Sequence, residues 1–140
     1  MTGVMLIPAY TPPLPDDAHL TLVYAGEDDD TDTHTLARLT WQARHYASQH
    51  KAFPARVVGP NFHFGDSHDE PVLLIHLTPE IALMRSGVEQ FSRSEYTEFR
   101  PHVSVPALRG LPSRHLPKTL YFNRISVWNS HAKVDYWLGA

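Results

Sequence analysis

The chain has 140 residues, 42% hydrophobic and 19% charged, which fits a soluble protein with one domain spanning residues 1–140. It has no cysteine, which excludes disulfides, thiolate metal sites and cysteine nucleophiles. The formal net charge of −3 argues against a broad electrostatic grip on long duplex nucleic acid. No apolar run reaches membrane-spanning length and no signal peptide opens the chain, so we expect a cytoplasmic protein without membrane contact. We also expect a monomer.

The first part of the chain predicts two strands followed by a helix. The strands are Val4–Ile7 and His19–Tyr24, separated by a proline-rich extended connection. The helix is expected from about Thr33 to His50. Its buried stripe has helical spacing and consists of Leu36, Leu39, Ala43 and Ala47.

An acidic loop at residues 27–32 lies directly before this helix. Carboxylates there are favoured by the positive end of the helix dipole, and Asp32 or Thr33 can cap the helix. A calcium loop would need spaced oxygen ligands and a turn glycine, which this run lacks. We therefore expect a structural loop.

The second part predicts a hairpin, a helix and three further strands. Strands Ala55–Phe64 and Pro71–Leu77 are joined by a turn at residues 65–70. Thr78 caps the second helix, and Pro79 occupies its first position. After the strand that contains residues 102–105 come Thr119–Trp128 and Ala132–Leu138. The resulting order β-β-α-β-β-α-β-β-β predicts an α+β fold.

Two short β-prone segments each carry a histidine and a hydroxyl residue two positions apart. Side chains alternate along a strand, so His19 and Thr21 share one face and leave Leu20 and Leu22 on the other. The same alternation places His102 and Ser104 together. We expect the fold to bring these two faces to one cleft.

The spacing alone is weak, because His76 and Thr78 repeat it. Thr78 is needed as a helix cap, so His76 is interpreted as a structural histidine in the sheet. A metal-dependent hydrolase is a further hypothesis for a chain with ten histidines. However, His34, His45 and His50 in the first helix form no same-face pair with an acid.

The surroundings of the two segments are more specific. The run His19 to Gly26 resembles the first signature of the two-histidine (2H) phosphoesterase superfamily, a His-x-Thr-x strand that enters a glycine turn. The run Phe99 to Val105 resembles the second, an aromatic-x-Pro-His-x-Thr/Ser-x strand. The superfamily includes 2′-5′ RNA ligase-like proteins and cyclic phosphodiesterases. The intervening order of helix, hairpin and helix also matches, so the likeness spans nearly the whole chain.

The resemblance implies a bilobal fold, two facing sheet-plus-helix lobes with a central cleft. The catalytic residues would be His19, Thr21, His102 and Ser104. One imidazole would accept a proton while the other donates one, and the hydroxyls would bind the non-bridging phosphate oxygens, with no metal or cofactor. Histidines suit this exchange because their intrinsic pKa lies near neutrality. Which histidine is the base stays open.

Other side chains are candidates for binding the substrate. Arg100 has the parity of His102 and can reach a phosphate. The possible base-stacking aromatic residues are Tyr24, Phe64, Tyr121 and Trp128. The sequence departs from the superfamily pattern in Ser104 and in the segment Pro106–Leu108, where a basic residue is common.

The expected activity is cleavage of 2′,5′-linked or 2′,3′-cyclic phosphodiesters in small nucleotides or short oligonucleotides, including cyclic-nucleotide defence signals. The alternative is a non-catalytic module that retains a nucleotide or second messenger in the same cleft. An enzyme would form a product, whereas a binding module would retain the intact ligand.

Overall fold

The computed structural model describes residues 1–64, 70–94, 98–130 and 132–139, so most of the predicted turn at 65–70 lies outside the described residues. The strands are β1 (Gly3–Pro8), β2 (Leu20–Tyr24), β3 (Phe53–Phe64), β4 (Glu70–Ile75), β5 (His102–Ser104), β6 (Thr119–Asn129) and β7 (Ala132–Trp137). The helices are α1 (Thr33–Gln49) and α2 (Pro79–Val88), and short 3₁₀ turns include η3 (Leu108–Gly110) and η4 (Ser113–His115). The predicted order of elements is confirmed.

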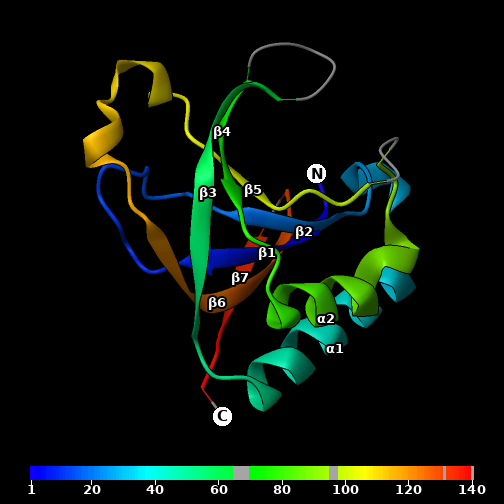
Figure 1. Ribbon diagram of the computed structural model, residues 1–140. Helices are drawn as coiled ribbons and strands as arrows, with labels where there is room; N and C mark the ends of the chain where they lie inside the picture. The colour runs from blue at the N-terminus through cyan, green and yellow to red at the C-terminus, as the bar shows by residue number, and fades with distance from the viewer. Residues whose placement is uncertain (65–69, 95–97, 131, 140) are drawn as a thin grey trace.

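All seven strands belong to one curved sheet with the order β1-β2-β5-β4-β3-β6-β7. Strand β6 also pairs with β1, so six strands form a closed ring of hydrogen-bonded neighbours, and β7 extends from β6. In Figure 1, β3 and β4 stand across β1 and β2, which shows how strongly the sheet bends. The α+β class is confirmed, and the two expected halves are joined through a continuous sheet.

Both helices pack against the sheet and against each other (Figure 1). Their predicted caps are present: Asp32 Oδ1 accepts from the Thr35 backbone at 2.6 Å, and Thr78 Oγ1 accepts from the Ile81 backbone at 3.1 Å. The buried Tyr46 of α1 crosses to α2, where its hydroxyl donates to the Leu83 carbonyl at 3.2 Å. The expected stripe of α1 and the buried residues of α2 therefore meet in one hydrophobic core.

A β-bulge in β2 lies next to the first histidine segment. The register passes from Val4↔Val23 to Met5↔Thr21 and omits Leu22. The Leu22 carbonyl instead accepts a hydrogen bond from Arg85 Nη1 of α2 at 2.7 Å. Helix α2 thus holds the strand segment that presents Thr21.

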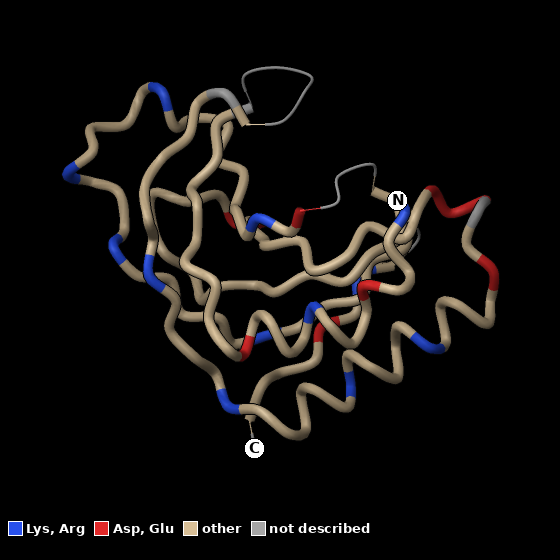
Figure 2. The backbone as a smooth tube through the Cα atoms, turned by 45° about the vertical axis from the view of Figure 1, so that its right-hand side comes forward, with Lys and Arg blue, Asp and Glu red and all other residues tan. Residues whose placement is uncertain are grey.

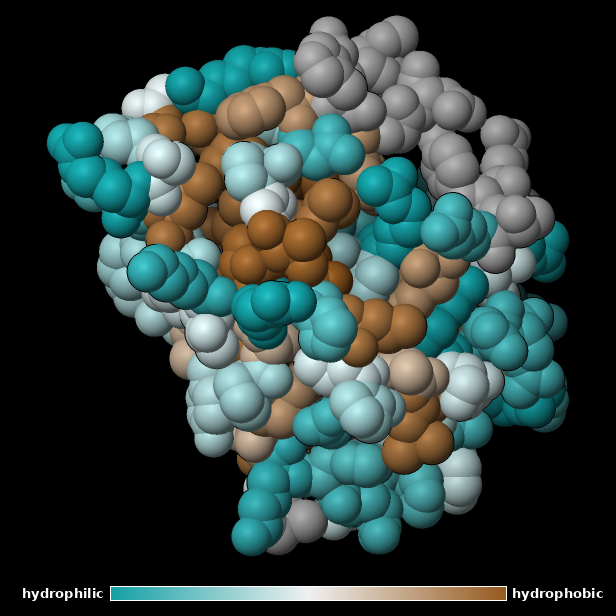
Figure 3. Space-filling view, in the orientation of Figure 1, coloured by the Kyte–Doolittle hydropathy of each residue, from teal (hydrophilic) through white to brown (hydrophobic). Residues whose placement is uncertain are grey.

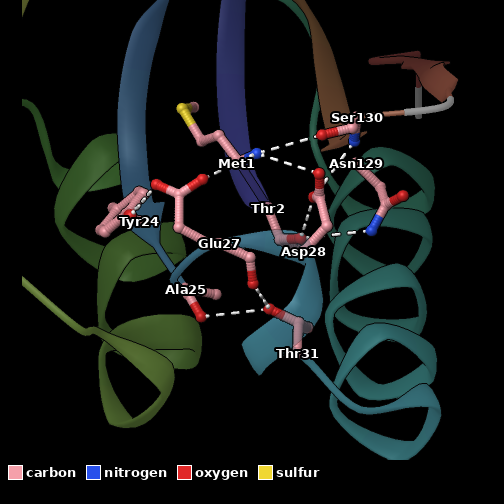
Figure 4. A network of polar contacts seen from close by, with 9 residues as sticks. All are labelled: Met1, Thr2, Tyr24, Ala25, Glu27, Asp28, Thr31, Asn129 and Ser130. Carbon is pink, nitrogen blue, oxygen red and sulfur yellow. Dashed lines mark hydrogen bonds and ion pairs between the residues drawn. The ribbon is translucent and has the colours of Figure 1, made fainter.

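The acidic loop is a structural junction, as the sequence suggested (Figure 4). Asp28 Oδ1 accepts from the Thr2 hydroxyl at 2.9 Å and from the Ser130 backbone at 3.1 Å. The Thr2 hydroxyl also accepts from Asn129 Nδ2 at 3.2 Å. These bonds tie the loop to the start of β1 and to the end of β6.

Two details of the sequence interpretation are wrong. His76 is exposed and lies just beyond β4, because the strand ends at Ile75 and the chain turns there toward the cap of α2. It is therefore not a histidine within the sheet. The strand expected from Ala55 begins at Phe53 instead, so Pro54 lies inside β3 opposite Tyr121.

Candidate active site

The two histidine segments are neighbours in the sheet. Strand β2 pairs antiparallel with β5, and Leu20 lies opposite Val103. In that register Thr21 is opposite His102, and the position of His19 is opposite Ser104. Directly opposed residues of an antiparallel pair have Cβ atoms roughly 5 Å apart. The pairing therefore groups two imidazoles and two hydroxyls into one compact block.

The block lies on the face of the sheet that points away from the core. Leu20 and Val103 have no exposed surface and belong to the hydrophobic core. Side-chain alternation then directs their neighbours to the other face, where all four predicted catalytic residues are half-buried. They are accessible to a ligand and are partly shielded from water.

Apolar side chains extend this face on both sides of the block. Leu74 of β4 is opposite His102, and Val72 is opposite Ser104. On the other side, Met5 of β1 is opposite Thr21. Val72 and Met5 are fully buried, so the surroundings of the polar block are largely dry. In such surroundings hydrogen bonds are electrostatically stronger than in water.

The two imidazoles are held in the same way. His19 Nδ1 lies 2.9 Å from the Asp17 carbonyl oxygen, and His102 Nδ1 lies 2.8 Å from the Arg100 carbonyl oxygen. A carbonyl oxygen only accepts, so each Nδ1 carries the proton in these bonds. Each Nε2 is then the unprotonated nitrogen of a neutral imidazole.

Each histidine also packs against an aromatic ring that the sequence proposed as a substrate contact. The ring centroids of His19 and Trp128 are 4.4 Å apart, and those of His102 and Phe64 are 4.1 Å apart. Trp128 comes from β6 and Phe64 from the end of β3. The closed sheet thus places one aromatic ring beside each histidine, and we call these two rings, Trp128 and Phe64, the aromatic walls of the site.

A cation lies over each of these aromatic rings. The Arg100 guanidinium is 5.0 Å from the Phe64 ring centroid, as its predicted position beside His102 allows. The Lys133 ammonium is 4.1 Å from the Trp128 ring centroid. Sequence reasoning missed Lys133. The sequence shows that Lys133 and Val134 point to opposite faces of their strand. It does not show that Lys133 lies opposite Trp128 in β6.

The remaining two aromatic candidates differ in position. The Tyr24 hydroxyl donates to Glu27 Oε1 at 2.7 Å, which anchors that ring to the acidic loop. Tyr121 is 49% exposed and lies toward the opposite end of β6 from Trp128. The structure therefore groups Trp128 and Phe64 with the histidines and does not group Tyr121 with them.

The first basic residue after the second motif is Arg109, in the connection between β5 and β6. Arg109 of η3 donates to the Phe62 carbonyl at 2.9 Å, which fastens this connection to β3. Figure 2 shows basic residues along the connection and acidic residues in the loop before α1, at opposite sides of the molecule. Figure 3 shows hydrophobic side chains near the middle of the viewed face, with hydrophilic ones around them.

Within the described residues, no group of three or more His, Asp or Glu side chains is placed to hold a metal ion. The same residues contain no helix long and apolar enough to span a membrane.

No family model and no curated protein matches the chain. Solved structures do match it over nearly its whole length. E. coli LigT complexed with ATP has a TM-score of 0.58 at 12% identity, covering 99% of this chain and 93% of that one. TT0787 of Thermus thermophilus has a TM-score of 0.56 at 17% identity, covering 98% and 80%. A protein described as a phosphoesterase has a TM-score of 0.53 at 13% identity, covering 99% and 95%.

These similarities define the class of the fold. The chain has the fold of the 2H phosphoesterases, in agreement with the resemblance of its two histidine segments.

Proposed function

We propose that the protein is a metal-independent 2H phosphodiesterase that cleaves 2′,5′-linked or 2′,3′-cyclic phosphodiesters of small nucleotides or short oligonucleotides. The observation that carries the proposal is the β2–β5 register, which groups His19, Thr21, His102 and Ser104 on one face. The fold shared with LigT and with a phosphoesterase supports the same class of reaction.

The chemistry follows from the two Nε2 atoms. Cleavage of a phosphodiester requires a proton to leave the attacking oxygen and another to reach the leaving oxygen. A neutral imidazole on one side of the phosphorus performs the first transfer, and an imidazolium on the other side performs the second. Thr21 and Ser104 donate hydrogen bonds to the non-bridging oxygens, where negative charge increases in the transition state.

The substrate class rests on the ring contacts and on the ligands of similar structures. Structures of LigT have been solved with NADP⁺, ATP and 3′-AMP, all of which contain an adenine nucleotide. The aromatic walls of Trp128 and Phe64 suit a ligand that combines bases with phosphate. A nucleotide phosphodiester meets both requirements.

The test is a substrate screen in EDTA with 2′-5′ oligoadenylates, 2′,3′-cyclic nucleotides and cyclic dinucleotides, followed by chromatography of the products. We expect turnover of at least one 2′,5′-linked or 2′,3′-cyclic substrate that persists in chelator. The double variant His19→Ala/His102→Ala serves as the blank. Turnover that requires added metal, or that survives in the blank, contradicts the proposal.

The same screen separates catalysis from retention of a ligand. In a stoichiometric mixture, a non-catalytic binding module returns the intact nucleotide after denaturation of the protein. An enzyme returns the product. Recovery of intact ligand from a complex that forms at micromolar concentration would replace the catalytic proposal with the binding one.

A further inference from the structure

Lys133 of the last strand, β7, lies close enough to the histidine block to contact the same ligand. The β6–β7 register sets Lys133 opposite Trp128 and Asp135 opposite Ser126. Opposed residues share a face, so Lys133 lies on the face of Trp128, the ring that packs against His19. The Lys133 ammonium and the His19 imidazole thus contact the same aromatic ring.

The arrangement on the His19 side repeats the one on the His102 side. On one side the order is His19, Trp128, Lys133. On the other side it is His102, Phe64, Arg100. The antiparallel pair Leu20↔Val103 has a local twofold axis that relates the two histidines. The two half-sites therefore have matching parts, and Arg100 is the counterpart of Lys133.

Among the described residues, no carboxylate forms an ion pair with Lys133. Asp135, two residues along the same face, is bound by Arg124 Nη1 at 3.3 Å. In the part of the chain that the structure describes, Lys133 has no ion pair, and its side chain is exposed. Holding a solvated cation above an apolar ring beside a site leaves it available for an anion.

Lys133 and Arg100 lie beside different histidines. The Lys133 ammonium lies over Trp128, which packs against His19, and the Arg100 guanidinium lies over Phe64, which packs against His102. A phosphate held between the histidines lies between the two cations. Each cation is then positioned for an additional anionic group on its own side.

We propose that Lys133 is a substrate-binding residue for a second phosphate, so that the site selects a diester that carries further phosphates over a cyclic mononucleotide. This inference rests on the proposed phosphodiesterase function. The ligand class is a linear or cyclic oligonucleotide with at least two phosphates, and the selection operates on binding.

The test compares Lys133→Met, which keeps the stem over Trp128 without the charge, with Lys133→Arg. Lys118→Met is the matched control, because Lys118 is exposed on the connection between β5 and β6. Calorimetry uses two probes: 3′-AMP with one phosphate, and 5′-phosphorylated 2′-5′ triadenylate with hydrolysis-resistant phosphorothioate linkages. Initial rates on 2′,3′-cyclic AMP are measured in parallel.

For Lys133→Met we expect about 10-fold weaker binding of the triadenylate, unchanged binding of 3′-AMP and a salt dependence lowered by about one ion. Lys133→Arg should restore binding, and Lys118→Met should change neither ligand. Equal weakening of both ligands, together with slower turnover of 2′,3′-cyclic AMP, would reveal a structural role through Trp128 and overturn the inference. So would an unchanged affinity, or failure of the wild type to bind the triadenylate.

The binding comparison does not depend on catalysis. A wild type that binds the triadenylate through Lys133 but cleaves no substrate contradicts the proposed function and leaves the Lys133 assignment intact. If the wild type cleaves 2′,3′-cyclic AMP but Lys133→Met binds the triadenylate normally, the proposed function stands and the Lys133 assignment is wrong.

Discussion

At the scale of single residues, the matched Nδ1 hydrogen bonds make the two histidines alike. Each acceptor is the backbone carbonyl two residues earlier, at Asp17 and at Arg100. The orientation of each imidazole is therefore set by backbone conformation, and it survives substitution of either of those side chains. A pair of similarly held imidazoles also fits a reaction in which the acid and the base exchange roles when the direction reverses.

The hydroxyl residues give the first residue-scale prediction. Thr21→Val keeps the shape of the side chain but removes the donor to a non-bridging oxygen, so kcat should fall about 100-fold with a small change in KM. Ser104→Ala should act in the same direction. Thr119→Val, an exposed position at the start of β6, is the control and should keep wild-type rates. A Thr21→Val enzyme with normal kcat would remove the hydroxyl from the mechanism.

At the scale of elements, the sequence predicted the features that depend only on residues close together in the chain. The caps Asp32 and Thr78 and the alternation around His102 were all readable, because each depends on residues within a few positions. Pairings between distant strands were not. Trp128 and Tyr121 share a strand and aromatic character. Among the described residues, Trp128 is the one of the two that packs against a histidine, because it lies in the part of β6 that pairs with β1.

Helix α2 supplies a prediction in which packing opposes helix propensity. Alanine is favoured over glycine inside a helix by about 1 kcal/mol. A Cβ at Gly87, however, would collide with the Tyr46 hydroxyl, which is buried and bonded to the Leu83 carbonyl. Gly87→Ala should therefore lower the free energy of unfolding by about 1–3 kcal/mol, measured in urea. Partial recovery in Gly87→Ala/Tyr46→Phe would identify the collision, and a more stable Gly87→Ala protein would refute it.

The contact between α2 and the bulge of β2 gives a second prediction at this scale. Arg85→Met keeps an apolar stem against Phe99 but leaves the buried Leu22 carbonyl without its donor. The unfolding free energy should fall by about 1–3 kcal/mol, with a lower kcat because Thr21 is adjacent to the bulge. Arg85→Lys should lose less of both. Wild-type stability and kcat in Arg85→Met would show that the bulge is held by other contacts.

At the scale of the whole molecule, the acidic loop joins the start of the chain to the wall of the site. Asp28 bonds to Ser130, two residues after Trp128. Partial desolvation acts to raise the pKa of Asp28, but hydrogen bonds from Ser130, Thr2 and the chain's amino group hold it below its ordinary 3.8. The hydrogen bond from the Thr35 backbone likewise lowers the pKa of Asp32. Both carboxylates stabilise the fold in their charged form.

These shifts predict the acid side of the stability curve. A carboxyl group whose pKa is lower in the folded protein contributes its full stability above its unfolded value, and the contribution is lost as pH falls through the folded value. The unfolding free energy should be flat from neutral pH to about 4 for these groups and should then decrease. Asp28→Asn should flatten that decrease in urea titrations at fixed pH. An equally steep decrease in Asp28→Asn would assign it to other groups.

The most direct test of the joint action of the two histidines is a double-mutant cycle on the best phosphodiester substrate in EDTA. If His19 and His102 act on one phosphate, each alanine variant should lose about 100- to 10,000-fold in kcat/KM, and the double variant should be little slower than either single one. If the two losses multiply in the double variant, or if either single variant keeps its wild-type rate, the histidines do not form one catalytic unit.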